Sequence, residues 1–235
     1  MSYFKKSVGF YLFVCAAAIL GAMLLSRAGS AVAVFSSETS TAPIVVIDAG
    51  HGGEDGGAIS VTGARESMLN LEISQRLNDL LHFLGVHTQM IRTEDISVYT
   101  EGDTIAQKKV SDIHNRVKAV EQTPNALLVS IHQNQFFESQ YRGAQVFYAQ
   151  GSQELAELLQ SDLAAQVDPR NHRQCKQAQG IYLLEHISCP AVLIECGFLS
   201  NPAEEALLRD ASYQKKLASV IACTLASYLE KTHEV

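Results

Sequence analysis

The chain has 235 residues, of which 47% are hydrophobic and 18% charged. This is enough apolar material for a packed core, and it excludes a disordered or low-complexity protein. Lys and Arg total 18 against 25 Asp and Glu, a formal net charge of −7, which argues against a nucleic-acid-binding protein because phosphate contacts need a basic surface. Before position 34 the only charged residues are Lys5, Lys6 and Arg27. The sequence therefore predicts an acidic domain behind a basic, apolar leader.

The leader contains an uncharged apolar segment of 19 residues at 7–25. As a helix it would extend about 28 Å, close to the thickness of the hydrocarbon core of a bilayer. Lys5 and Lys6 precede it, which by the positive-inside rule places the rest of the chain outside the cytoplasm. Residues 1–33 are thus predicted to form an N-terminal hydrophobic helix. It is either a membrane anchor, which its length favours, or a signal peptide cut after the A-x-A sequence at 31–33. Both leave the domain extracytoplasmic, membrane-anchored or secreted, and a buried helix of the globular domain is the weaker alternative.

Behind the leader, the Ser/Thr-rich residues 34–43 predict a linker, and 44–231 predict one domain of alternating strands and helices. Continuous apolar runs indicate buried strands, and apolar residues three or four apart indicate amphipathic helices. The expected elements are strands at 44–48, 86–91, 126–131, 143–148 and 191–194, and helices at 66–84, from a cap at Asp103 to about Glu121, at 152–166 and at 213–230. This order predicts an α/β fold, a single domain with a mostly parallel twisted sheet flanked by helices.

The cysteines give little sign of a disulfide framework. Cys15 lies in the leader, and the even number that remains permits disulfides in an exported chain: Cys175, Cys189, Cys196 and Cys223. Their wide spacing favours free thiols, and the absence of a C-x-x-C motif argues against a cysteine-based zinc site.

Polar residues follow three of the predicted strands. His51 lies in a glycine-rich loop after the strand at 44–48, His132 follows the strand at 126–131, and Glu195 follows the strand at 191–194. Because ligands collect outside the carboxyl ends of strands in open α/β sheets, these residues are expected at one edge of the sheet. The glycine loop fits neither a Walker A motif nor G-x-G-x-x-G, so a phosphate cradle is not expected.

Two histidines and a carboxylate at one edge favour a metal site of the catalytic zinc type, which leaves one position open. Glu66, at the start of the first long helix, is the leading carboxylate; it could instead stabilise that helix N-terminus. Asp48 and Asp55 are its rivals, and Asp48 is better suited to holding the loop or orienting a histidine ring. Taken alone, His132 could equally be a structural histidine.

Glu195 has two interpretations. A carboxylate at the end of an apolar strand is costly to desolvate, which favours a general base with a pKa tuned by burial. The alternative is a structural salt bridge, for which Arg92 is the candidate partner. Asp48, Arg92 and Asn134 complete the set of residues expected to support the site or contact substrate.

Four motifs together resemble one family. They are DAGHGGEDGGA at 48–58, Glu66 with Asn70 and Leu71, SIHQN at 130–134 and IECGFLSN at 194–201. In this order they are highly specific, and over 44–229 the chain resembles the zinc-dependent N-acetylmuramoyl-L-alanine amidases. The sequence departs from the usual pattern in having Ala49 where proline is common and Cys196 beside the glutamate.

The resemblance implies that His51, Glu66 and His132 bind one Zn²⁺ per chain and that Glu195 is the catalytic base. It implies peptidoglycan as substrate, with cleavage of the amide between N-acetylmuramic acid and L-alanine. Alternatives are a catalytically silent wall-binding protein on the same fold and another zinc amide hydrolase or peptidase.

Within the family the chain is most similar to the spore-cortex and germination-specific amidases of sporulating bacteria. The apolar leader, the lack of an added wall-binding module and the short segment between His132 and Glu195 carry this similarity. It implies a role in muramic-δ-lactam formation, a location in the forespore intermembrane or cortex space, membrane attachment through the leader and an accessory lipoprotein partner. No segment of the sequence marks a binding site for that partner.

Overall fold

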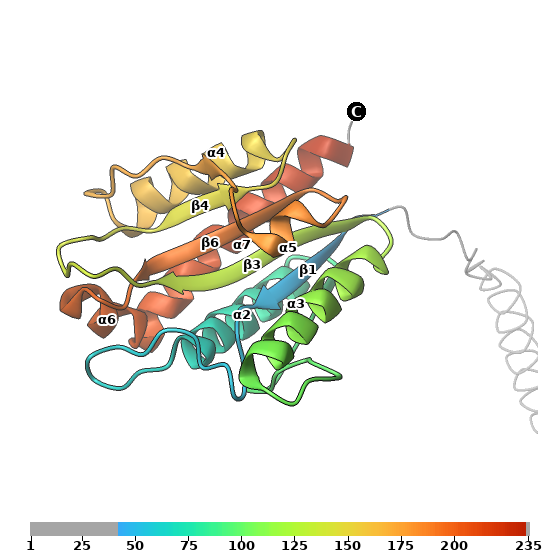
Figure 1. Ribbon diagram of the computed structural model, residues 1–235. Helices are drawn as coiled ribbons and strands as arrows, with labels where there is room; N and C mark the ends of the chain where they lie inside the picture. Colours follow the sequence, from blue (N-terminus) through green and yellow to red (C-terminus); the bar gives the residue numbers. More distant parts are fainter. Residues whose placement is uncertain (1–41, 234–235) are drawn as a thin grey trace, which may run out of the picture. The chain divides into compact units, whose positions relative to one another are not determined.

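The computed structural model describes residues 42–233 (Figure 1). The predicted anchor or signal peptide at 1–33, and the linker up to residue 41, lie outside the described residues. Within 42–233, no helix combines the length and the hydropathy needed to cross a membrane.

Six strands of the described part of the chain form one sheet in the order β2-β1-β3-β6-β4-β5. Parallel pairing joins all neighbours except β4 and β6, which are antiparallel, so the expected α/β fold with a mostly parallel sheet is confirmed. The strands are β1 (Ile44–Ala49), β2 (Thr88–Met90), β3 (Ala126–Asn134), β4 (Gln145–Tyr148), β5 (Lys176–Gln177) and β6 (Ala191–Phe198).

Helices cover both faces of this sheet (Figure 1). One face packs against α2 (Glu66–Phe83), α4 (Gln153–Asp162) and α7 (Ala211–His233), whose leucines enclose the larger core with the central strands. The other face packs against α3 (Ile105–Glu121) and the short α5 (Tyr182–Glu185). A π-helical turn, η1 (Leu163–Val167), continues α4, and α6 (Pro202–Leu208) follows β6. Because β1, β3 and β6 have helices on both sides, their apolar runs are continuous rather than alternating.

The boundaries differ from the sequence prediction in ways that bear on the site. β3 and β6 continue past the apolar runs and take His132 and Glu195 into the sheet, where the two are paired across the strands. The ladder continues because both strands still have neighbours to bond, whatever the polarity of their side chains. Thr104, not Asp103, caps α3, since its side chain and Gln107 form a reciprocal capping box. Sequence periodicity is too short to reveal β5, α5 or α6, which were not expected.

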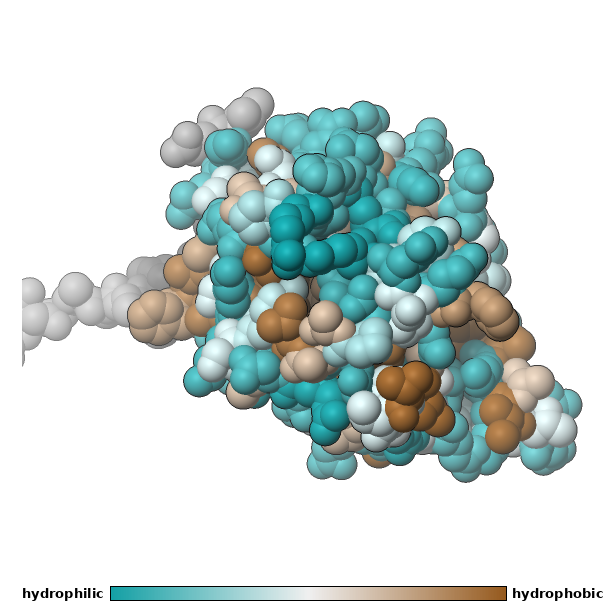
Figure 2. Space-filling view, turned by 90° about the vertical axis from the view of Figure 1, so that its left-hand side faces the viewer, coloured by the Kyte–Doolittle hydropathy of each residue, from teal (hydrophilic) through white to brown (hydrophobic). Residues whose placement is uncertain are grey.

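The carboxyl ends of β1, β3 and β6 meet at one edge of the sheet, which Figure 2 views directly. That face is mostly hydrophilic, with separate hydrophobic patches. The pairing places His132 of β3 opposite Glu195 of β6, and Glu195 opposite Gln145 of β4. Directly paired residues project from the same face of a sheet, so these three side chains form a row across it.

Candidate metal centre and active site

The glycine-rich loop after β1 delivers His51 to the edge of the sheet. His51 adopts a positive φ of 60°, a conformation that few residues other than glycine accept. Two glycines leave the space that the site needs. A Cβ on Gly50 would overlap the His132 ring, and one on Gly57 would lie 2.6 Å from Glu66 Oε2. Close approach to these side chains therefore explains the glycines better than turn formation alone.

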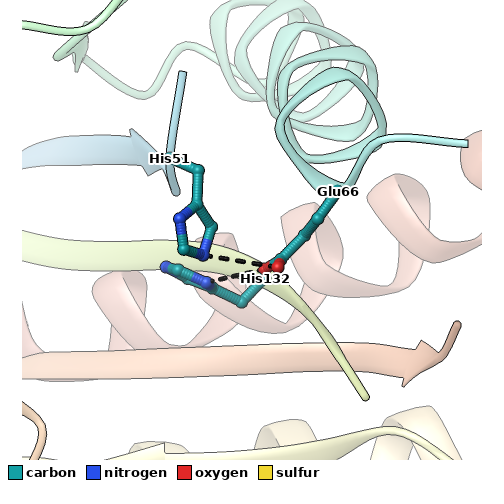
Figure 3. Close-up of side chains that lie close together, drawn as sticks. All are labelled: His51, Glu66 and His132. Carbon is teal, nitrogen blue, oxygen red and sulfur yellow. Dashed lines mark hydrogen bonds and ion pairs between the residues drawn. The ribbon is translucent and has the colours of Figure 1, made fainter. Parts of the chain in front are cut away.

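Three polar side chains converge beside this loop (Figure 3). His51 Nε2 lies 3.3 Å from Glu66 Oε2, and His132 Nδ1 lies 3.0 Å from Glu66 Oε1. One nitrogen of each histidine and one oxygen of the glutamate all lie within 4.8 Å of one another. The residues come from the β1 loop, the first turn of α2 and β3, and the structure brings them together as the sequence pattern predicted.

This cluster fits a divalent metal such as zinc. Two imidazoles and one carboxylate are the three-ligand set of catalytic zinc sites. Glu66 is only 4% exposed; burial opposes its ionisation, but hydrogen bonds from His132 and His51 hold its pKa well below the usual range. It is therefore an ionised carboxylate, the form in which a metal is bound.

Hydrogen bonds from the neighbouring chain fix the orientation of Glu66. Its Oε1 accepts from the Asn70 side chain at 3.3 Å and from the Gln133 amide at 3.2 Å. Its Oε2 accepts from the Ala58 amide at 2.9 Å. Asn70 also donates to the Gly50 carbonyl, so the first turn of α2 is tied to the glycine loop.

Asp55 lies outside the cluster and holds the ring of His51. Its Oδ2 is 2.9 Å from His51 Nδ1, and Lys109 Nζ lies 2.8 Å from its other oxygen. With Nδ1 occupied, His51 presents Nε2 to Glu66. Burial lowers the pKa of His51 on its own account, but the bonds to Asp55 and Glu66 raise it to about 9. Asp55, the rival candidate for the metal ligand, therefore contacts the Nδ1 side of the His51 ring, while Glu66 lies at its Nε2 side.

Asp48 holds the loop through a buried arginine that the sequence reasoning missed. Arg116 of α3 forms an ion pair with Asp48 and donates to the carbonyls of Ala49 and His51 at 3.0 and 2.7 Å. Ser130 donates to the second Asp48 oxygen at 2.6 Å. Asp48 has no hydrogen bond to a histidine ring in this structure, so of its two expected tasks the geometry fits holding the loop.

Arg92 serves the same loop and does not pair with Glu195. It is 2% exposed and donates to the carbonyls of Ala49 at 2.7 Å, Gly50 at 3.0 Å and Ser67 at 2.7 Å. Burial, with Arg116 nearby, lowers its pKa to about 10, which leaves it charged at neutral pH. The alternative of an Arg92–Glu195 salt bridge is thus wrong.

Glu195 has a carboxylate oxygen that the described residues leave unpaired. Its Oε2 is buried and has no hydrogen-bond partner among the described residues. Burial, with Glu66 adding to it and the two histidines opposing it, raises its pKa to about 7. A carboxyl group held near neutral pKa beside a ligand cluster suits proton transfer. Asn134 ends β3 two residues beyond His132, and its carbonyl accepts from Leu199.

The four cysteines of the described chain are free. Cys196 points into the core on the side of the sheet away from Glu195 and is 1% exposed. Burial raises the pKa of its thiol far above the ordinary value, so it remains a neutral thiol. Although Cys196 is next to Glu195 in the sequence, its side chain lies in the core and does not contact the His51–Glu66–His132 cluster.

The α/β sheet, the His-Glu-His donor set and the buried carboxylate beside it are the arrangement of a metal-dependent hydrolase. The chain belongs to the N-acetylmuramoyl-L-alanine amidase family, whose model matches residues 45–227. It is accordingly an amide hydrolase, and the family resemblance carried by the sequence motifs is confirmed.

Individual relatives refine this assignment. The chain is 36% identical over 184 residues to the germination-specific N-acetylmuramoyl-L-alanine amidase of Bacillus subtilis, covering 76% of each chain. Among solved structures it is similar to the CwlD amidase from Clostridioides difficile, determined in complex with the GerS lipoprotein. That match has a TM-score of 0.77 and 39% identity, and it covers 80% of this chain and 98% of that one. The amidase LytC of B. subtilis is 31% identical over 189 residues, covering 78% of this chain and 35% of LytC.

Proposed function

We propose that the protein is a zinc-dependent amidase that hydrolyses the bond between N-acetylmuramic acid and L-alanine and so removes stem peptides from peptidoglycan. The observation that carries the proposal is the unpaired Oε2 of Glu195, on the residue directly opposite His132 in the sheet. His51, Glu66 and His132 would hold one zinc ion per chain.

The residues divide the chemistry between them. When bound, zinc supplies a Lewis acid that polarises the amide carbonyl and lowers the pKa of water. Glu195 takes a proton from the attacking water, because its free oxygen faces no competing donor. It then gives that proton to the nitrogen of L-alanine as the carbon–nitrogen bond breaks, which a carboxyl group with a pKa of about 7 can do near neutral pH. Asp55, Arg92 and Arg116 keep the loop and the His51 ring in place.

The decisive experiment separates metal binding from hydrolysis. Glu195→Gln keeps the shape of the side chain but cannot accept a proton. We expect this variant to retain one zinc per chain and to lose about 10²–10⁴-fold in the rate of stem-peptide release. Mass spectrometry of digested peptidoglycan and metal analysis measure the two properties. The matched control is Glu230→Gln, an exposed position on α7, which should behave as wild type.

Three outcomes would contradict parts of the proposal. Full activity of Glu195→Gln would remove the base assignment. Release of single amino acids instead of whole stem peptides would indicate a zinc peptidase. Zinc binding without any product from the wild-type protein, with cortex peptidoglycan as substrate and the accessory lipoprotein present, would favour a catalytically silent wall-binding protein.

We further propose that the protein acts outside the cytoplasm, on spore cortex, in muramic-δ-lactam formation. Similarity to a germination-specific amidase supports this role, and the apolar leader supports export and membrane attachment. An accessory lipoprotein is a proposed partner, because a similar amidase was solved in complex with one. Loss of muramic-δ-lactam from the cortex of a strain lacking this protein would test the role.

A further inference from the structure

A group of arginines lies on the opposite side of Glu195 from the metal-ligand cluster. Arg142 and Arg170 share one carboxylate, Asp168, which lies 2.6 Å from Arg142 Nη2 and 3.5 Å from Arg170 Nε, and Arg173 lies beside Arg142. Arg173 has no carboxylate partner in the described part of the chain. Glu204, also close, accepts hydrogen bonds from two backbone amides. The group is a local excess of positive charge in a protein with a formal net charge of −7.

Arg173 is held in a fixed position although it pairs with no acid. Its Nε donates to the Arg142 carbonyl at 2.7 Å, and its Nη1 donates to Gln145 Oε1 at 3.0 Å. Its guanidinium lies over the Phe198 ring, with Cζ 4.5 Å from the ring centroid. Nη2 bonds to none of the described residues. An oriented, half-buried guanidinium with one free edge is suited to binding an anion.

The sheet register connects this guanidinium to the reacting groups. Gln145, which holds Arg173, is the direct partner of Glu195 in the β4–β6 ladder. Phe198, which lies under Arg173, is three residues beyond Glu195 on β6, but a bulge sets it opposite Asn134, only two residues beyond His132. Phe198 is therefore about 7 Å from Glu195 along the strand. In Figure 2 the most strongly hydrophilic side chains of the carboxyl-end face gather in its upper half, at the height of β4 in Figure 1.

The chemistry of the substrate identifies which anion can reach this point. The carboxyl group of N-acetylmuramic acid is consumed in the scissile amide, so the glycan beside the bond is uncharged. The free carboxylates belong to the peptide, at its C-terminus and on any acidic side chain. An extended peptide covers about 3.3–3.6 Å per residue, so a carboxylate about two residues from the scissile bond can reach the level of Phe198, over which Arg173 lies.

We propose that Arg173, positioned by Gln145, Phe198 and the Arg142 carbonyl, binds a carboxylate of the stem peptide and directs the peptide over β6 and β4. This subsite rests on the proposed function, and it gives an acidic enzyme a local means of binding an anionic substrate. Arg142, whose buried Nε has no partner in the described structure, adds to the positive potential there.

The test compares two soluble muropeptides that differ only in whether the peptide carboxylates are free or amidated. We expect wild-type kcat/KM to be roughly 10- to 100-fold lower on the amidated substrate than on the free-carboxylate substrate. This factor corresponds to the loss of one hydrogen bond between charged groups. Arg173→Gln should show that same loss on the free-carboxylate substrate and no further loss on amidation. The loss should fall on KM, because the contact is made equally in ground and transition states. Arg76→Gln is the matched control: Arg76 is also half-buried and also bonded to a glutamine, Gln214, but on α2.

Binding of the free stem peptide, measured by calorimetry, tests the subsite without hydrolysis. Arg173→Gln should weaken binding of the peptide with free carboxylates by the same factor and leave the amidated peptide unaffected. If zinc-loaded wild type cleaves neither muropeptide but still binds the free-carboxylate peptide more tightly than the amidated one, the proposed function fails and the subsite stands. The subsite is refuted if Arg173→Gln, folded as judged by its thermal midpoint, still distinguishes the two substrates, or if Arg76→Gln loses as much.

Discussion

Replacement of Asp55 measures how much the carboxylate behind His51 contributes to binding at the proposed metal site. Asp55 accepts the bond from His51 Nδ1 at 2.9 Å, which leaves Nε2 available to the proposed metal ion. Loss of such a partner typically lowers metal affinity 10- to 100-fold, or about 1.4–2.8 kcal/mol at 1.4 kcal/mol per tenfold. We expect a loss in this range for Asp55→Ala. Asp55→Asn should lose less, because its amide oxygen still accepts the bond although the charge is gone.

Replacement of Lys109, which also contacts Asp55, provides the comparison for the loss of Asp55 itself. Lys109 holds the other oxygen of Asp55, but its side chain is 52% exposed. Exposed ion pairs contribute about 0–1 kcal/mol, so Lys109→Met should change zinc affinity by no more than about fivefold. Competition with a chromophoric chelator at one fixed pH measures all three variants. An Asp55→Ala affinity within twofold of wild type, or a larger loss for Lys109→Met, would refute the assignment of Asp55.

Two further substitutions test the support of the site, and one labelling experiment tests the burial of Cys196. Asp48→Asn leaves the charge of Arg116 buried without its partner and should cost about 3–5 kcal/mol in denaturant unfolding at neutral pH; less than about 1 kcal/mol would contradict this. Burial raises the pKa of Asp48, but Arg116, His132 and Ser130 together hold it below its ordinary value. This stabilisation is therefore lost as the pH falls through the lowered pKa, and the two proteins should converge in acid. Gly50→Ala places a methyl group in the space of the His132 ring and should reduce zinc affinity by about tenfold or more; an unchanged affinity would mean that the ring can move aside. Cys196 should react with a thiol reagent only after unfolding, and reaction in the folded protein would contradict its burial.

The sequence was sufficient to predict the ligand cluster because of a general property of parallel sheets. Apolar runs ending in His51, His132 and Glu195 place those residues at the carboxyl edge, and Glu66 returns to it at the start of a helix. The structure brings His51, His132 and Glu66 close enough together to bind one metal ion. Their roles in metal binding and proton transfer remain predictions.

The residues that support the cluster were harder to predict, because their partners are distant in sequence. Arg116 meets Asp48 across 68 positions, and Lys109 meets Asp55 across 54. Both ion pairs depend on how α3 packs against the glycine-rich loop, and no local sequence pattern encodes that packing. The choice between Asp48 and Asp55 as the partner of His51 depended on the loop conformation, including the positive φ of His51.

The pairing of β1 with β3 has a consequence for how native structure is judged. Six residue pairs join the strands, from Ile44 opposite Ala126 to Ala49 opposite Ile131. A slip of two residues would keep every apolar side chain on its own face, so the domain would still be compact. It would nevertheless displace the His51 loop from His132 by about 6.6 Å, at 3.3 Å per residue. Compactness and helix content would not distinguish the two arrangements, whereas stoichiometric zinc binding would report the correct alignment of the strands.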